Sequence, residues 1–192
     1  MKSIALAVFF SLAIHTQAQQ LGSMNTKLSL PEFERLATRC APRVAIETMD
    51  AIAQTESAFH VYAISLNRPE AAARRAGWTN HRVELLRQPK DRAEAIRWMH
   101  WFAQRGYSVS VGLMQVNVEN ALRFGLRPEQ LFDSCTNVSV GSAILGSAYA
   151  QAKQTESSGN DAILDSISIY NSGSKTTGYV NGYVSTVVKN SH

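Results

Sequence analysis

The chain has 192 residues, of which 45% are hydrophobic and 18% are charged. This composition is typical of a globular protein and argues against intrinsic disorder, and the length suits one domain with a substantial core. The formal net charge of +4 is compatible with an anionic partner surface, but no stripe of basic and aromatic residues supports it as a nucleic-acid site. We therefore expect no nucleic-acid binding.

The N-terminus has the pattern of a secretory signal peptide. Lys2 precedes an apolar run over residues 4–14, and Thr16-Gln17-Ala18 supplies small residues near the expected cleavage position. The run is too short to span a bilayer comfortably, and no later segment is long or apolar enough to try. We expect residues 1–18 to be a signal peptide, with a retained anchor as the alternative, and residues 19–192 to form one exported domain without stable membrane insertion.

The first half of the chain predicts two helices and a small sheet. Residues 32–39 follow a proline and carry acidic residues in the first turn, which favours a helix, and a second helix is expected over residues 43–57. Residues 61–66 and 83–86 are short and rich in aliphatic residues, so they can pair as strands. The insert between them, residues 68–80, has helical start and stop signals.

The second half predicts helices separated by turns. A capping box begins at Asp91, and Asn117, Asn137 and Asp161 stand where N-caps are expected. Apolar residues at helical spacing predict the inward faces of the last three helices. These residues are Val140, Ile144, Ala148, Ile163, Ile167, Tyr170, Val180, Val184 and Val187.

A carboxylate interrupts the apolar stripe of the second helix. Ala45, Met49 and Ile52 fall on one face, and the next position on that face is Glu56, in the last turn. Partial burial and the negative end of the helix dipole both raise the pKa of such a carboxyl. A carboxylic acid that stays protonated near neutral pH is suited to general acid catalysis. The alternative is a glutamate at a frayed helix end whose side chain reaches water.

Other patterns of known sites are missing from the sequence. The five histidines have no metal-ligand spacing, and there is no phosphate-binding glycine loop or serine nucleophile elbow. Trp98 and Trp101 are candidates for stacking on sugars, but their helical spacing favours a place in the core. We expect neither a metal nor a cofactor.

The two cysteines, Cys40 and Cys135, allow a single intramolecular disulfide. It would close a long loop and contribute up to roughly 4–5 kcal/mol in the chain-entropy model. Two buried free thiols are the alternative, which the export signal disfavours.

Three segments together resemble the motifs of the soluble lytic transglycosylases, which have a lysozyme-like fold and cleave peptidoglycan. They are Ala-Gln-Thr-Glu-Ser at residues 53–57, Ser-Val-Gly-Leu-Met-Gln-Val-Asn at residues 110–117 and Ile-Tyr-Asn-Ser-Gly at residues 169–173. The chain is most similar to the branch that serves type IV secretion, conjugation and pilus machines. That likeness rests on residues 87–89, 131–137 and 181–184. Departures are Val109-Ser110-Val111 in place of a Gly-Ala pair, the long insert, and a serine at position 134 where the branch has proline.

The resemblance implies an α+β, mainly α-helical fold, as a lysozyme-like single domain with a small β-region. It implies that Glu56 is the catalytic acid and that Met114 and Gln115 line the cleft beside it. Tyr170 and Asn171 would hold the sugar and the orientation of Glu56. It further implies a periplasmic protein, which we expect to be a monomer, acting on peptidoglycan glycan strands beside the subunits of an envelope machine.

Four candidate site residues could instead have purely structural roles. Ser65 and Asn117 are further substrate-binding candidates for the same cleft, although roles in a strand and as a helix cap explain them equally well. Met114 and Tyr170 would also fit a hydrophobic core.

The resemblance also implies a mechanism with one carboxylate. The next acidic candidates, Glu70, Asp91, Glu119 and Asp133, stand at helix starts or in turns where capping explains them. One carboxylate suffices if the muramoyl 6-hydroxyl attacks in place of water and forms a 1,6-anhydro ring. The alternatives are a hydrolytic muramidase, which needs a second acidic group or a positioned water, and a non-catalytic peptidoglycan-binding scaffold subunit.

Overall fold

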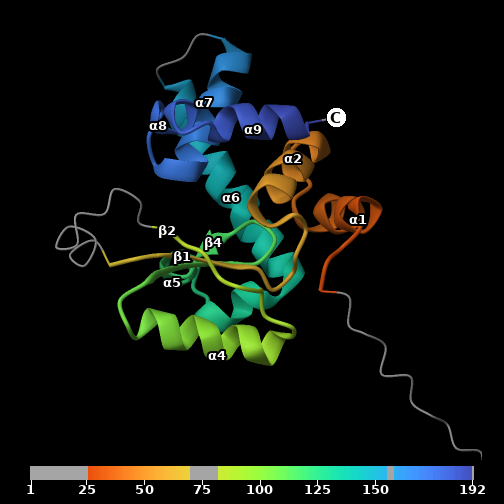
Figure 1. The fold of residues 1–192 in the computed structure, drawn as a ribbon. Helices are drawn as coiled ribbons and strands as arrows, with labels where there is room; N and C mark the ends of the chain where they lie inside the picture. The colour runs from red at the N-terminus through yellow and green to blue at the C-terminus, as the bar shows by residue number, and fades with distance from the viewer. Residues whose placement is uncertain (1–25, 70–81, 155–157, 192) are drawn as a thin grey trace, which may run out of the picture.

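The structure is a computed structural model that describes residues 26–69, 82–154 and 158–191. The expected signal peptide and most of the insert at residues 68–80 lie outside the described residues. Helices dominate the fold, and a small antiparallel sheet lies between α4 and the other long helices (Figure 1). The expected mainly helical α+β class is therefore confirmed. The helical elements are α1 (Leu30–Cys40), α2 (Ile46–Ser57), α4 (Arg92–Ala103), α5 (Glu119–Arg123), the 3-10 helix η1 (Pro128–Phe132), α6 (Ser134–Lys153), α7 (Gly159–Ser172), α8 (Thr177–Val180) and α9 (Tyr183–Asn190).

The longest described helix, α6, connects the two ends of the molecule. It packs against α7, α1 and η1, while α2 packs against α1 and α9. Figure 1 shows α7, α8 and α9 at one end of α6, and the sheet with α4 at the other end. Phe33 of α1 and Met49 and Ile52 of α2 are fully buried in the core that these helices share.

The sheet has the strand order β2-β1-β3-β4, and neighbouring strands are antiparallel. The expected strand pairing appears as β1 (Ile64–Asn67) beside β2 (Arg82–Val83). Two further strands, β3 (Ser108–Val111) and β4 (Val116–Asn117), were not expected. The apolar side chains of the sheet point into the core, and its polar side chains therefore share the opposite face. The buried apolar residues of the sheet are Ile64, Leu66, Val109, Val111 and Val116.

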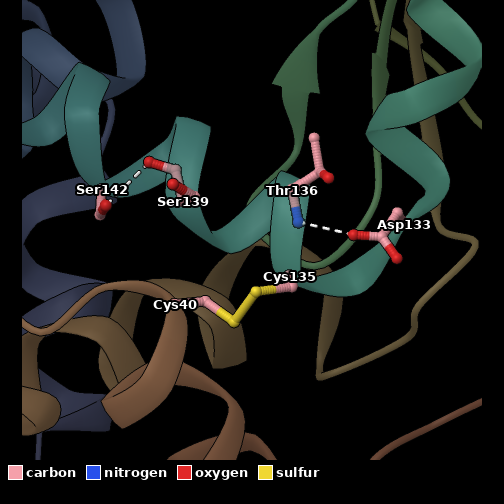
Figure 2. The surroundings of a disulfide bond; sticks show 6 residues. All are labelled: Cys40, Asp133, Cys135, Thr136, Ser139 and Ser142. Atoms are coloured by element: carbon pink, nitrogen blue, oxygen red, sulfur yellow. Dashed lines mark hydrogen bonds between the residues drawn. A yellow bond between two sulfur atoms is a disulfide. The ribbon is translucent and has the colours of Figure 1, made fainter.

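The helix starts differ in part from those expected. Asp91 caps α4 as expected, because its side chain accepts a hydrogen bond from the backbone N–H of Glu94. The prediction that Asn137 caps α6 is wrong: the cap is Asp133, which accepts from the N–H of Thr136 (Figure 2). Ser158, and not Asp161, stands at the N-cap of α7.

Most residues that were predicted to face inward on the last three helices are buried in the structure. Val140, Ala148, Ile167, Val184 and Val187 are buried. Two members of the predicted stripes are exposed, Ile163 on α7 and Val180 at the end of the short helix α8.

The two tryptophans of α4 have different surroundings. Trp98 packs against the core as expected. The expected core position is wrong for Trp101, which is 50% exposed, and the guanidinium of Arg105 lies 3.8 Å from the centre of its ring. A cation over an aromatic face explains an exposed tryptophan without a ligand.

The predicted disulfide is present between Cys40, the last residue of α1, and Cys135 in the first turn of α6 (Figure 2). The two Cα atoms lie 5.4 Å apart and the bridge spans 95 positions of sequence. It joins the helix that precedes α2 to the central helix α6. None of the helices within residues 26–69, 82–154 and 158–191 has both the length and the apolar character needed to cross a membrane.

Candidate active site

A pocket of about 780 Å³ lies where α2, the polar face of the sheet, α7 and the start of α9 meet. Six of the seven expected site residues line it: Glu56, Ser65, Gln115, Asn117, Tyr170 and Asn171. The pocket lining also includes residues that sequence reasoning did not select. Among these are Asn67, Arg82, Ser110, Asn120, Asn181 and Tyr183.

Glu56 is partly buried at the end of α2, on the face predicted from the apolar stripe. Met49 and Ile52 on that face are fully buried, whereas Ala45 is exposed before the helix begins. Burial raises the pKa of Glu56 to about 7. The hydrogen bond from Tyr183 and the positive charge of Arg82 act in the opposite direction. A carboxyl with this pKa can both give and take a proton near neutral pH.

Among the residues that sequence reasoning missed, Tyr183, the first residue of α9, contacts the acid directly. Its hydroxyl donates a 2.5 Å hydrogen bond to Oε1 of Glu56. Burial, and next the charge of Glu56, raise the pKa of Tyr183, so the phenol remains a donor. Its backbone N–H donates to Oδ1 of Asn181, whose Nδ2 donates to Oδ1 of Asn171. The available signal was the segment at residues 181–184, which carried part of the family resemblance but no assigned role.

Hydrogen bonds from two other helices, α2 and α6, hold the turn that carries Met114 and Gln115. Ser57, next to the acid, donates a hydrogen bond to the carbonyl of Leu113. The buried amide of Asn137 accepts from the N–H of Met114 and donates to the carbonyl of Val111. A Cβ at Gly112, which has φ of +79°, would lie 2.3 Å from this amide, so the position requires glycine.

Met114 is the expected site residue that the structure places outside the pocket lining. Its side chain is fully buried and belongs to the core cluster. Its carbonyl accepts a 2.6 Å hydrogen bond from the hydroxyl of Tyr170. Tyr170 was expected to bond to Glu56 or to substrate, and in the structure it instead fixes the neighbouring turn while its side chain lines the pocket.

Gln115 has an unusual conformation and an unused acceptor. Its φ of 45° is rare for a residue with a side chain, and its Nε2 donates to the carbonyl of Gly112. Its buried Oε1 has no hydrogen-bond partner in the described part of the chain. Strained backbone and unsatisfied buried acceptors gather at binding sites, where a ligand can supply the missing donor.

The polar face of the sheet forms another wall of the pocket. Ser65, Ser110 and Asn117 lie directly opposite one another across β1, β3 and β4, and all three line the pocket. The Nδ2 of Asn117 donates to Ser108, and its Oδ1 accepts from the N–H of Glu119 at the start of α5. The prediction that Asn117 is the N-cap is wrong, because Val118 holds that position, yet Asn117 still binds the first N–H of α5 from one residue earlier and also lines the pocket.

Glu56 is the sole acidic side chain among the described residues that line the pocket. The other acidic candidates within the described residues, Asp91, Glu119 and Asp133, lie elsewhere. No group of three or more His, Cys, Asp or Glu side chains in that part of the chain could hold a metal ion. The arrangement can therefore supply one proton-transferring carboxyl among neutral hydrogen-bonding groups, with Arg82 as the one cationic side chain of the described lining.

Comparisons with known proteins find a family model and several relatives that match most of this chain. Residues 36–191 match the family model described as "Transglycosylase SLT domain". The chain is 37% identical over 157 residues to the protein virB1 of Agrobacterium fabrum, covering 82% of this chain and 58% of the relative. It is 36% identical over 148 residues to the type IV secretion system protein virB1 of Brucella abortus, covering 77% and 56%. The chain thus spans less than two thirds of the length of these relatives. No solved structure gives a significant match.

Proposed function

We propose a glycan-cleaving function from the premise that this chain belongs to the transglycosylase SLT domain family. In this proposal it is a peptidoglycan lytic transglycosylase. It cleaves the β-1,4 bond between N-acetylmuramic acid and N-acetylglucosamine and leaves a 1,6-anhydro end on the muramoyl residue.

Glu56 would act twice in this reaction. Its protonated carboxyl donates the proton to the glycosidic oxygen as the bond to the muramoyl C1 breaks, and the N-acetylglucosamine leaves with a new hydroxyl. The resulting carboxylate then takes the proton of the muramoyl 6-hydroxyl while that oxygen bonds to C1. The proton balance closes on Glu56, and no water is consumed. A pKa of about 7 suits both steps, because neither protonation state is strongly favoured near neutral pH.

The observation that carries the proposal is the lone acidic side chain in the described pocket lining. A hydrolase with two carboxylates would place the second one across the scissile bond from Glu56. Apart from Arg82, the polar groups that line the pocket with Glu56 are neutral acceptors and donors, which suit sugar hydroxyls and N-acetyl groups. The buried Oε1 of Gln115 is the best candidate to accept from a substrate N–H or O–H, with Ser65, Asn117 and Asn171 as further contacts.

Product analysis tests the proposal directly. Purified protein is incubated with peptidoglycan, and the released muropeptides are identified by mass spectrometry. Anhydro-muramoyl ends are expected. Reducing muramoyl ends would instead establish the hydrolytic muramidase, and an absence of cleavage in a zymogram would favour the non-catalytic scaffold subunit.

The cellular role follows from relatives whose names place them in type IV secretion systems. We propose that this chain acts in the periplasm, with residues 19–192 as the working domain, and opens the wall locally for such a machine. A strain that carries only the Glu56→Gln protein should then assemble fewer machines than one that carries the wild type.

A further inference from the structure

Arg82 is the one cationic side chain among the described residues that line the pocket. It lies in β2, at the edge of the sheet, directly opposite Asn67 of β1. Directly opposed residues share a face, and alternate residues of a strand do too, so Arg82, Asn67 and Ser65 lie on one face. That face continues through Ser110 and Asn117, and Arg82 therefore extends the polar wall of the pocket by one strand beyond Asn67.

The backbone of Arg82 is fixed although its side chain is exposed. The neighbouring Val83 pairs with Leu66 and packs against the core. The Nη1 of Arg68 donates a 2.7 Å hydrogen bond to the carbonyl of Arg82. This bond also brings a second guanidinium to the same edge of the sheet. The edge thus carries two guanidinium groups, one of them on the anchored strand β2.

The electric field of Arg82 reaches the acid. Its positive charge is one of the influences that lower the pKa of Glu56 against the effect of burial. Glu56 and Arg82 are the charged side chains of the described pocket lining, so with Glu56 protonated the lining carries a net positive charge. A neutral sugar chain gains little from such a field, whereas an anionic one is attracted and oriented by it.

The substrate class of the proposed function carries anionic groups on every muramoyl residue. A stripped strand bears the lactyl carboxylate, and a strand with peptide stems bears stem carboxylates in its place because the lactyl group is then an amide. A guanidinium presents paired N–H donors that match a carboxylate, which makes arginine better suited than lysine to this contact.

We propose that Arg82 forms an anion subsite that binds a carboxylate of the muramoyl residue, so that the pocket selects charged glycan strands over neutral ones. This inference rests on the proposed function for its substrate class. Binding can nevertheless be measured without cleavage, which keeps the two ideas separable.

The experiment measures binding in the full chain with the Glu56→Gln substitution, with and without Arg82→Gln. Three fluorescently labelled soluble strands serve as probes: one with peptide stems, one stripped of stems, and a stripped strand whose lactyl carboxylates are converted to methylamides. Arg97→Gln, an exposed arginine on α4 outside the pocket lining, is the matched control. Wild-type turnover on the same three strands is recorded in parallel.

Arg82→Gln should raise the Kd for a charged strand about three- to tenfold, leave the Kd for the methylamide strand unchanged, and remove the excess salt dependence of the charged strand. Arg82→Lys should retain part of the affinity. A loss on the stripped strand assigns the lactyl carboxylate, and a loss confined to the strand with stems assigns a stem carboxylate. An equal loss on all three strands, or a loss matched by Arg97→Gln, overturns the anion subsite. An absence of wild-type turnover overturns the proposed function, and the binding measurements alone then decide whether Arg82 forms an anion subsite.

Discussion

The hydroxyl of Tyr183 donates a hydrogen bond to the carboxyl of Glu56 from a position 127 residues later in the chain. The bond joins the start of α9 to the end of α2, two helices that pack side by side. It stabilises the charged form of Glu56, while burial stabilises the neutral form. The proton affinity of the acid is therefore a balance between the two, and it depends on the last helix of the fold.

Replacing Tyr183 by Phe should shift this balance and keep most of the packing. Without the donor, the pKa of Glu56 rises above about 7, and the alkaline limb of the pH–rate profile moves to higher pH. Turnover near neutral pH should fall about tenfold or more, because a bond to a reacting group is lost. Tyr149→Phe, on α6 and outside the pocket lining, is the control. An unchanged pH profile would show that Tyr183 does not tune the acid.

Glu56→Gln should fold and lose peptidoglycan cleavage by at least roughly two orders of magnitude, because an amide cannot donate a proton on demand. Glu47→Gln provides a matched change at an exposed position of the same helix. The measurement is the initial rate of release of soluble fragments. If purified Glu56→Gln retained most of the wild-type rate, Glu56 could not be the acid.

The raised pKa of Glu56 also predicts how stability changes with pH. Between pH 4.5 and about 7 the folded state binds more protons than the unfolded state, so this group makes the protein less stable as the pH rises. At roughly 1.4 kcal/mol per pKa unit, the destabilisation reaches about 3 kcal/mol above pH 7. Glu56→Gln should therefore be more stable than the wild type at pH 8 and similar to it at pH 4, in denaturant titrations. Equal stability at both pH values would contradict a raised pKa.

Tyr170→Phe should destabilise the protein and not merely slow it. The Tyr170 hydroxyl donates to the carbonyl of Met114, and its removal leaves a buried acceptor without a partner. The expected loss is about 1–3 kcal/mol. For a chain of this size it lowers the Tm by about 2–4 °C per kcal/mol. An unchanged Tm together with a large loss of turnover would place the hydroxyl on substrate or on Glu56 instead.

The disulfide should be formed in the exported protein and should contribute to its stability. Thiol labelling of unreduced, denatured wild type should detect no free cysteine. The double variant Cys40→Ser, Cys135→Ser should lose up to roughly 4–5 kcal/mol of unfolding free energy. A reductant should lower the Tm of the wild type and leave that of the variant unchanged. Two reactive thiols per wild-type chain would disprove the bridge.

The features that could be predicted from the sequence depend on short local patterns or on the number of residues of one type. The carboxyl of Glu56 stands out because helical periodicity is regular over the turns that precede it. The bridge follows from there being two cysteines, and the start of α4 from Asp91, a typical N-cap residue whose partner N–H is three residues later. Each of these needed no knowledge of distant contacts.

The features that sequence could not predict depend on tertiary contacts or on very short elements. Strand β4 has two residues, too few for an alternation to be recognised. The bond between Tyr183 and Glu56 joins helices whose relative rotation no stripe specifies. Asn137 has the residue type of an N-cap, but it is 1% exposed and bonds to backbone groups of other segments. Local preference named the wrong role for it because burial with complete hydrogen bonding outweighs a cap.

The first two turns of α6 restrict how this protein can diverge. Cys135 forms the disulfide with α1, and Asn137 accepts a hydrogen bond from the turn that carries Met114. Gly141 packs so closely on this turn that a Cβ there would lie 2.6 Å from the Cβ of Met114. One inserted or deleted residue in this stretch rotates everything beyond it by about 100° around the helix axis. After such a change, α6 could no longer form the disulfide and contact the turn that carries Met114 and Gln115 at the same time, whatever residue was inserted. We therefore expect viable variants to differ here by substitution at fixed length, and a scan of single-residue insertions through α6 should find its least tolerant positions between Cys135 and Gly141.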